Sequence, residues 1–167
     1  MTQELRETRV FTYAPANGAL DEINLRLLDE LRRDPRLTMT ELGRRIGMSS
    51  PAVTERIRRL EDVGVIGGYH LELNPAALGL PLAAYIRIRP DPGQLQRVAD
   101  LARDIPEVVE CHRITGEDCF ILKVHFPAMD QLDRILDRFL AYGTTTTSIV
   151  QSSPVPPRSL PLPEMPR

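Results

Sequence analysis

The pattern of apolar residues along the chain changes abruptly at Leu20. Residues before it show no sustained periodicity, whereas those after it recur at the spacing of three and four that is typical of an amphipathic helix. This spacing predicts a first helix that Asp21 caps and that ends at Asp34-Pro35. A second short helix is predicted over residues 41–46. Gly47 follows it, at the position where a left-handed cap is favoured.

A third predicted helix follows a cap at Ser49. Its spacing places Val53, Ile57 and Leu60 on a buried face. The opposite face is formed by Pro51, Thr54, Glu55, Arg58, Arg59 and Asp62. Two short helices joined by a tight turn, the second rich in arginine, form the layout that places a helix in the DNA major groove. We therefore interpret residues 40–68 as a DNA-reading element.

Beyond residue 81 the pattern alternates with the period of two that is typical of strands, and two amphipathic helices interrupt it. The predicted elements are a strand over 82–89, a helix over 94–104, strands over 108–115 and 119–126, a helix over 129–140 and a strand over 144–151. The order β-α-β-β-α-β is that of the ferredoxin-like fold. The two helices would cover one face of the sheet, so we expect the other face, or the sheet edges, to form a dimer.

The predicted fold class is α+β, with an N-terminal helix-turn-helix domain of winged-helix type and a C-terminal ferredoxin-like βαββαβ domain. The predicted divisions are a flexible N-terminal arm (1–19), the helix-turn-helix domain (20–68), a linking strand or hinge (69–81), the ferredoxin-like effector-binding and oligomerisation domain (82–153) and a Pro-rich tail (154–167). Proline accounts for six of the last 14 residues, so we expect this tail to be extended and mobile, or draped over a neighbouring subunit.

The composition limits how such a protein can bind DNA. The net charge is −2 and the isoelectric point about 5.9, so any DNA-binding surface must be a local patch whose contacts an oligomer multiplies. No apolar run approaches the length of a membrane span, and residues 1–18 lack the apolar core of a signal peptide. Two cysteines are too few for a disulfide framework, and we expect a cytoplasmic protein without membrane partners.

The candidate DNA contacts lie on the second and third predicted helices. They are Arg44, Arg45, Ser50, Thr54, Glu55, Arg56, Arg58 and Arg59. Arg58 and Arg59 point outward and suit phosphate or base contact. Arg56 lies beside the buried stripe, so pairing with a nearby acid that orients the helix is an equal alternative. Glu55 has a similar alternative as a solvated or internally paired side chain.

These motifs, in this order, resemble the Lrp/AsnC (feast/famine) family of transcription regulators over about residues 20–153. The resemblance is carried by Leu20-Asp21, Glu41-Leu42-Gly43, Ser49, Val53, Arg56-Ile57, Leu60-Glu61, Gly64-Val65-Ile66 and Gly68-Tyr69, and then by Leu78-Gly79, Thr115-Gly116, Leu122-Lys123-Val124, Thr145, Thr147 and Ile149-Val150. It implies a regulator that binds double-stranded DNA and responds to a small molecule, usually an amino acid. It also implies homodimers that assemble further into tetramers or octamers.

In such regulators the effector binds between dimers, near the turn of the middle strands and near the last strand. Carried onto this chain, the implied effector site comprises Gly116, Glu117, Asp118, Cys119, Thr145 and Thr147. Cys119 stands where the family usually has an acidic residue. An effector's ammonium group would therefore have to rely on Asp118 or Glu117.

Two other functions stay open at this point. Sirohaem decarboxylases resemble the same family, and His112, His125 and Arg113 would be the candidate residues for such an enzyme. The other is an amino-acid sensor that does not bind DNA. The histidines have no close ligand spacing, although His112 and His125 would meet if they lay opposite each other across the hairpin. The two cysteines form no CxxC pair. A two-residue turn at Gly116-Glu117 would pair residue 114 with 119 and residue 111 with 122, so the two sulfurs would not face each other. We predict neither a metal site nor a cofactor nor an enzyme.

Overall fold

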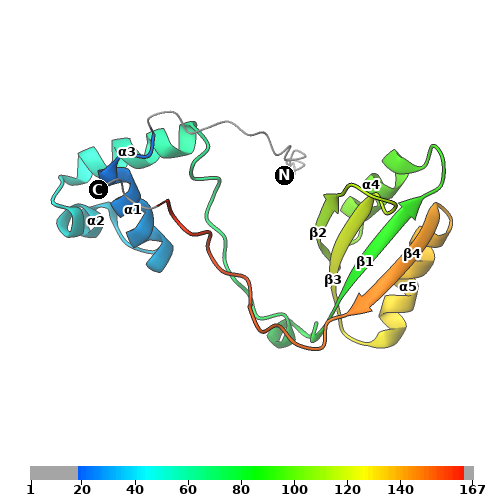
Figure 1. The fold of residues 1–167 in the computed structure, drawn as a ribbon. Helices are drawn as coiled ribbons and strands as arrows, with labels where there is room; N and C mark the ends of the chain where they lie inside the picture. The colour runs from blue at the N-terminus through cyan, green and yellow to red at the C-terminus, as the bar shows by residue number, and fades with distance from the viewer. Residues whose placement is uncertain (1–18, 164–167) are drawn as a thin grey trace. The chain divides into compact units, whose positions relative to one another are not determined.

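The computed structural model describes residues 19–163, and these form two compact units (Figure 1). The first unit comprises the described residues up to His70 together with residues 157–163, and the second comprises Leu71–Pro156. The predicted flexible arm lies outside the described residues except for Ala19. The predicted tail was set apart from both domains, whereas the structure groups its described part from residue 157 onward with the first unit.

The first unit contains helices α1 (Glu22–Arg33), α2 (Met39–Ile46) and α3 (Ser50–Asp62). The cap at Asp21 is confirmed, because its Oδ1 accepts a hydrogen bond from the Asn24 N–H at 2.7 Å. Gly47 is also confirmed as a left-handed cap, with φ of 77°. Ser49 occupies the N-cap position of α3, but its side chain makes no capping hydrogen bond, so that part of the prediction was wrong.

A capping box that the sequence analysis missed begins α2. The Thr38 hydroxyl oxygen accepts from the Glu41 N–H, and the Glu41 carboxylate accepts from the Thr38 N–H, each at 3.2 Å. The Glu41 carboxylate also accepts from the Thr38 hydroxyl at 2.9 Å, and the two hydrogen bonds that it accepts from Thr38 lower its pKa. The T-x-x-E sequence Thr38–Glu41 was the signal for this box, and it moves the helix start from the predicted residue 41 to Met39.

The helices of the first unit pack around one apolar core. Its buried members are Leu27, Leu31, Leu37, Leu42, Ile46, Val53 and Ile57. The backbone of the turn between α2 and α3 packs directly against Gly43 of α2. The Met48 N–H donates to the Gly43 carbonyl at 2.8 Å. A Cβ atom on residue 43 would collide with the Met48 carbonyl oxygen. The tight turn therefore depends on glycine at position 43.

The strand predicted between the domains is absent. Residues 67–74 form neither helix nor strand, and a short 3-10 helix, Ala76–Leu78, follows them. Tyr69, Leu71 and Leu73 do alternate as a strand would, but all three side chains are exposed. A strand requires backbone hydrogen bonds to a neighbour, and within the described chain this segment has no strand beside it.

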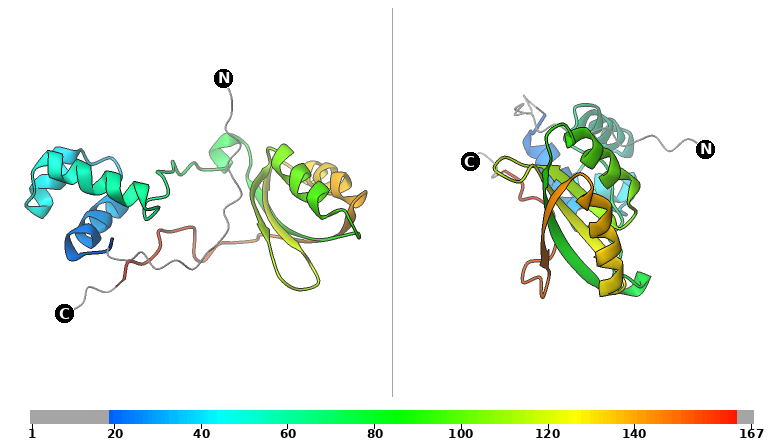
Figure 2. Two further views of the ribbon diagram at one scale, coloured as in Figure 1. Left: turned by 90° about the horizontal axis from the view of Figure 1, so that it is seen from above. Right: turned by 90° about the vertical axis from the view of Figure 1, so that its right-hand side faces the viewer.

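The second unit confirms the ferredoxin-like prediction. Its elements are β1 (Leu82–Pro90), α4 (Leu95–Asp104), β2 (Val108–Arg113), β3 (Phe120–Phe126), α5 (Met129–Leu140) and β4 (Gly143–Ile149). The strands form an antiparallel sheet in the order β2-β3-β1-β4. Helices α4 and α5 cover one face of this sheet (Figure 2). Strands β2 and β4 end two residues earlier than predicted, before the chain turns away from the sheet.

The two faces of this sheet differ in chemistry. The face toward the helices buries alternate apolar residues of β1 and β3, including Ile86, Ile88 and Leu122, in a core that α4 and α5 complete. The open face carries exposed polar side chains, among them Arg87 and Arg89. Sequence alternation in β1 is thus explained by one buried and one open face.

A substitution at position 43 tests how closely the turn approaches α2. Alanine normally stabilises a helix interior by about 1 kcal/mol relative to glycine. We expect Gly43→Ala to have the opposite sign, lowering the free energy of unfolding of the first unit by about 1–3 kcal/mol, because the new Cβ displaces the Met48 carbonyl. Chemical denaturation followed by circular dichroism measures this change. An increase in stability would show that the turn yields without cost.

Candidate nucleic-acid interface and effector turn

The exposed face of α3 is the one that the sequence predicts. Thr54, Glu55, Arg58 and Arg59 are exposed, while Val53 and the other residues of the buried stripe lie in or against the core. The Thr54 hydroxyl donates to the Ser50 carbonyl at 3.0 Å, which fixes it against its own helix. Among the described residues, no ion pair joins Arg58 or Arg59 to an acid. Both guanidinium groups are therefore available to an anionic ligand.

Arg56 is held within the first unit. Its Nη1 donates to Asp21 Oδ2 at 2.7 Å and to Asn24 Oδ1 at 3.0 Å, so the alternative that it pairs with an acid is confirmed. Asn24 is only 6% exposed, and its amide nitrogen donates to the Ala19 carbonyl at 2.8 Å. Burial by itself would raise the pKa of Asp21, but the hydrogen bonds from Arg56 and Asn24 lower it. The network ties the middle of α3 to the start of α1.

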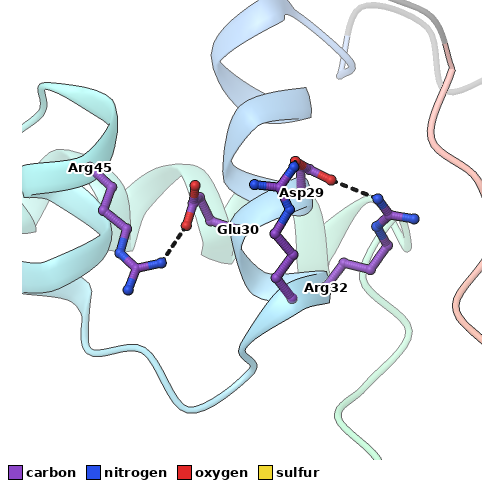
Figure 3. A network of polar contacts seen from close by, with 5 residues as sticks. Asp29, Glu30, Arg32 and Arg45 are labelled. Carbon is purple, nitrogen blue, oxygen red and sulfur yellow. Dashed lines mark hydrogen bonds and ion pairs between the residues drawn. The ribbon is translucent and has the colours of Figure 1, made fainter.

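Arg45 is also occupied within the first unit (Figure 3). From α2 its Nη1 reaches Glu30 Oε2 on α1 at 2.6 Å, and this hydrogen bond raises the pKa of Arg45. Arg44, its neighbour, is exposed. Contact of either arginine with DNA stays a prediction, but only Arg45 would have to release a carboxylate first.

The turn between β2 and β3 follows the predicted register. The Ile114 N–H donates to the Cys119 carbonyl at 2.9 Å, and Cys111 lies opposite Leu122, as the predicted hairpin requires. The Cys119 N–H donates to the Ile88 carbonyl at 2.9 Å, which fixes the turn beside the end of β1. The Cys119 side chain is half-buried and packs against the apolar core. It is therefore placed for packing rather than for binding an ammonium group.

Two arginines of β1 hold the acids of this turn, and the sequence analysis missed them. Arg89 pairs with Glu117, and Asp118 lies 3.8 Å from Arg87 and 4.0 Å from Arg89, measured from each Nε to a carboxylate oxygen. The Asp118 side chain is 26% exposed against 85% for Glu117, so Asp118 is the more enclosed carboxylate. The signal was present: the alternation of β1 places Arg87 and Arg89 on one face.

The predicted effector residues do not all share one face. Thr145 lies opposite Ile88 and Thr147 opposite Ile86, so both threonines are half-buried on the helix-covered face. Their neighbours in β4, Thr144 and Thr146, lie opposite Arg89 and Arg87 and share the open face with them. In the sheet, β1 lies between β3 and β4. Arg87 and Arg89 of β1 therefore lie between the threonines of β4 and the acids of the turn that joins β2 to β3.

The histidines do not form a site. His112 lies opposite Ile121 and His125 opposite Ala83, so the two do not meet across the hairpin. Arg113 follows His112 directly in β2 and therefore points to the other face. His125 Nδ1 is buried without a hydrogen-bond partner, and burial lowers the pKa of this imidazole.

Residues 19–163 contain neither a metal-binding cluster nor a membrane-spanning helix. No group of three or more His, Cys, Asp or Glu side chains in this range is placed to hold a metal ion. No described helix is long and apolar enough to cross a bilayer.

Comparison with known families matches both units. Residues 20–66 match the winged helix-turn-helix DNA-binding domain, and residues 83–160 match the Lrp/AsnC ligand-binding domain. The chain is 35% identical over 133 residues to the HTH-type transcriptional regulator LrpC of Bacillus subtilis, which covers 80% of this chain and 92% of that protein. The described residues after α3 contain no strand before β1, so the wing of the matched domain has no β-structure in this chain.

Solved structures with bound amino acid are also similar. A feast or famine regulatory protein from M. tuberculosis complexed with L-methionine has a TM-score of 0.77 at 34% identity, with 84% of this chain and 98% of that chain covered. A transcriptional regulator from Neisseria meningitidis in complex with L-Met has a TM-score of 0.76 at 30% identity, with 85% and 96% covered. The coverage of both comparisons extends across the two units.

Removing the Arg56 guanidinium tests the network that holds α3. We expect Arg56→Ala to lower the free energy of unfolding by about 1–3 kcal/mol, because the buried Asn24 carbonyl loses its donor and Asp21 loses its partner. The matched control is Arg58→Ala on the exposed face of the same helix, expected to change stability by less than about 0.5 kcal/mol. Urea denaturation measures both. Equal effects of the two substitutions would contradict the structural role of Arg56.

Proposed function

The chain belongs to the Lrp/AsnC family of transcriptional regulators, and we propose that α3 is the helix that it lays in the DNA major groove. The observation that carries the proposal is the different state of the arginines on this helix. Arg56 is bound to Asp21 and Asn24, whereas Arg58 and Arg59 are exposed and unpaired among the described residues. One arginine therefore orients the helix, and two contact DNA.

Each part of α3 has a role in this proposal. Ser50, Thr54 and Glu55 lie in the first turns, the part of a recognition helix that approaches base edges. Arg58 and Arg59, one turn later, contact phosphates and bases. Arg44 on α2 adds a phosphate contact that positions the domain.

Affinity in this proposal comes from multiplicity. A chain with a net charge of −2 provides a weak overall field, so a single domain contributes few phosphate contacts. A homodimer would present two copies of α3 to half-sites about one helical turn apart, or a multiple of it. Further assembly of dimers into tetramers or octamers would add contacts and bend the DNA. The open face of the sheet is the surface that we propose for pairing, because α4 and α5 leave it uncovered.

We further propose that the effector is an amino acid that binds at the turn formed by residues 116–119. An amino acid carries both charges, and this corner of the sheet offers both: Asp118 for the ammonium group, and Arg87 and Arg89 for the carboxylate. The L-methionine bound to the two similar structures supports this chemistry. The family pattern has an acidic residue at the position of Cys119, and in this proposal Asp118 provides that carboxylate instead. Binding would alter DNA affinity only if one assembly state binds the effector better than another.

The DNA contacts are tested by a double substitution. We expect Arg58→Ala/Arg59→Ala to weaken binding to the operator by about 1–3 kcal/mol for each arginine removed, and to reduce the dependence on salt concentration, because phosphate contacts release counterions. Mobility shift with DNA from upstream of the chain's own gene, at matched salt, measures this. The control, Arg134→Ala/Arg138→Ala on α5, removes the same charge from the second unit. Equal binding by the two variants would contradict the proposal.

The effector site is tested by thermal unfolding in the presence of each amino acid, beginning with L-methionine. A ligand that binds only the folded protein at about 100 times its Kd stabilises it by about 2.7 kcal/mol. We expect Asp118→Asn to abolish the rise in Tm, because the ammonium group loses its carboxylate. The control Asp133→Asn, at an exposed position of α5, should keep it. A full rise in Tm with Asp118→Asn would place the effector elsewhere.

A further inference from the structure

The C-terminal segment of the described chain returns to the first unit. Residues 157–163 group with the helices of that unit although the whole second unit separates them in sequence. Every residue from 151 to 163 is exposed except Leu162, which is half-buried. Leu160, two residues earlier, is 83% exposed. One leucine of the Leu160–Pro163 sequence thus makes a packing contact, and the other does not.

Leu162 lies at a groove between α1 and α2. The groove is lined by Leu25, Arg26, Asp29, Glu30, Arg45 and Ile46, and Leu162 and Pro163 form its remaining wall. The cavity that they enclose has a volume of about 280 Å³. A second groove of the same unit, between α1 and α3, contains no residue of the C-terminal segment in its lining. The segment therefore lies specifically against α1 and α2.

The groove has the chemistry to hold such a segment. Leu25 and Ile46 provide apolar surface from two helices, and the side chain of Leu162 is of the same kind. The ion pair between Glu30 and Arg45, two residues of the lining, joins α1 to α2 beside this apolar surface (Figure 3). Charged side chains thus surround an apolar floor, the arrangement that accepts one apolar anchor and leaves its neighbours in water.

The alternation of leucine and proline suits this role. Proline fixes φ, so Leu160-Pro161-Leu162-Pro163 is already extended before it binds and loses little conformational entropy. Proline also has no backbone N–H, so Pro161 and Pro163 bring no donor that the apolar surface would leave without a partner. The segment can therefore lie against a groove that offers no strand edge.

We propose that the groove between α1 and α2 is the docking site of this chain's own C-terminal segment, with Leu162 as its anchor. The docked segment holds the C-terminal end of the described chain to the first unit by side-chain packing. No residue of α3 lines the groove, so docking leaves the exposed face of α3 uncovered. Docking involves the folded chain alone and does not depend on DNA binding.

Two variants of the full chain test the docking by hydrogen exchange and mass spectrometry. We expect Leu162→Asp to increase the exchange rate of amides in α1 and α2 by about tenfold, because the apolar anchor leaves the groove. Leu160→Asp introduces the same charge at an exposed position and should leave exchange unchanged. Amides of β1 and β3 serve as the internal reference. Equal exchange in the two variants overturns the proposal.

Cross-linking identifies which copy provides the segment. In a chain with Cys111→Ser and Cys119→Ser, a photoreactive maleimide is attached to Leu162→Cys, with Leu160→Cys as the control. We expect Leu162→Cys to cross-link to α1 or α2 within one chain. The experiment uses ¹⁴N- and ¹⁵N-labelled chains refolded together from denaturant. Cross-links between labelled and unlabelled chains would overturn the assignment to the same chain, and cross-links outside α1 and α2 would overturn the docking site.

Discussion

The hydrogen bonds from Arg56 to Asp21 and Asn24 tie the middle of α3 to the start of α1. The buried stripe of Val53, Ile57 and Leu60 sets which face of α3 turns inward. The charged network has a directional requirement, and Asn24, buried with both of its amide atoms in use, cannot move without losing a partner. The apolar stripe therefore directs Arg58 and Arg59 outward, and the hydrogen-bond network adds a directional tie that holds the helix in this orientation.

Arginine side chains also hold carboxylates in place in the second unit. Arg87 and Arg89 hold Glu117 and Asp118 beside the end of β1, so opposite charges lie together before any ligand arrives. A bound amino acid would exchange the ion pairs between Asp118 and the two arginines for ion pairs with its own ammonium and carboxylate groups. The charged side chains that it needs are already in place before it binds. The two units thus use arginine in two ways, to orient a helix and to keep a charged corner preorganised.

Much of this fold could be predicted from the sequence, because helices with one apolar stripe and strands with strict alternation leave clear periodicities. The exposed face of α3 and the register that places Cys111 opposite Leu122 followed from spacing alone. The linking strand expected within residues 69–81 was wrong because alternation describes a single segment, whereas a strand needs a neighbour. The pairing of Arg87 with Asp118 was missed because it joins residues from separate strands, which no local pattern reports.

Residues 157–163 make the first unit discontinuous along the chain. During synthesis, α1, α2 and α3 leave the ribosome first, but the wall that Leu162 and Pro163 add to the groove is made only after the whole second unit. The order of synthesis therefore places the completion of the N-terminal unit last. A nascent chain that stalls before this segment would carry a three-helix unit with the groove between α1 and α2 still open.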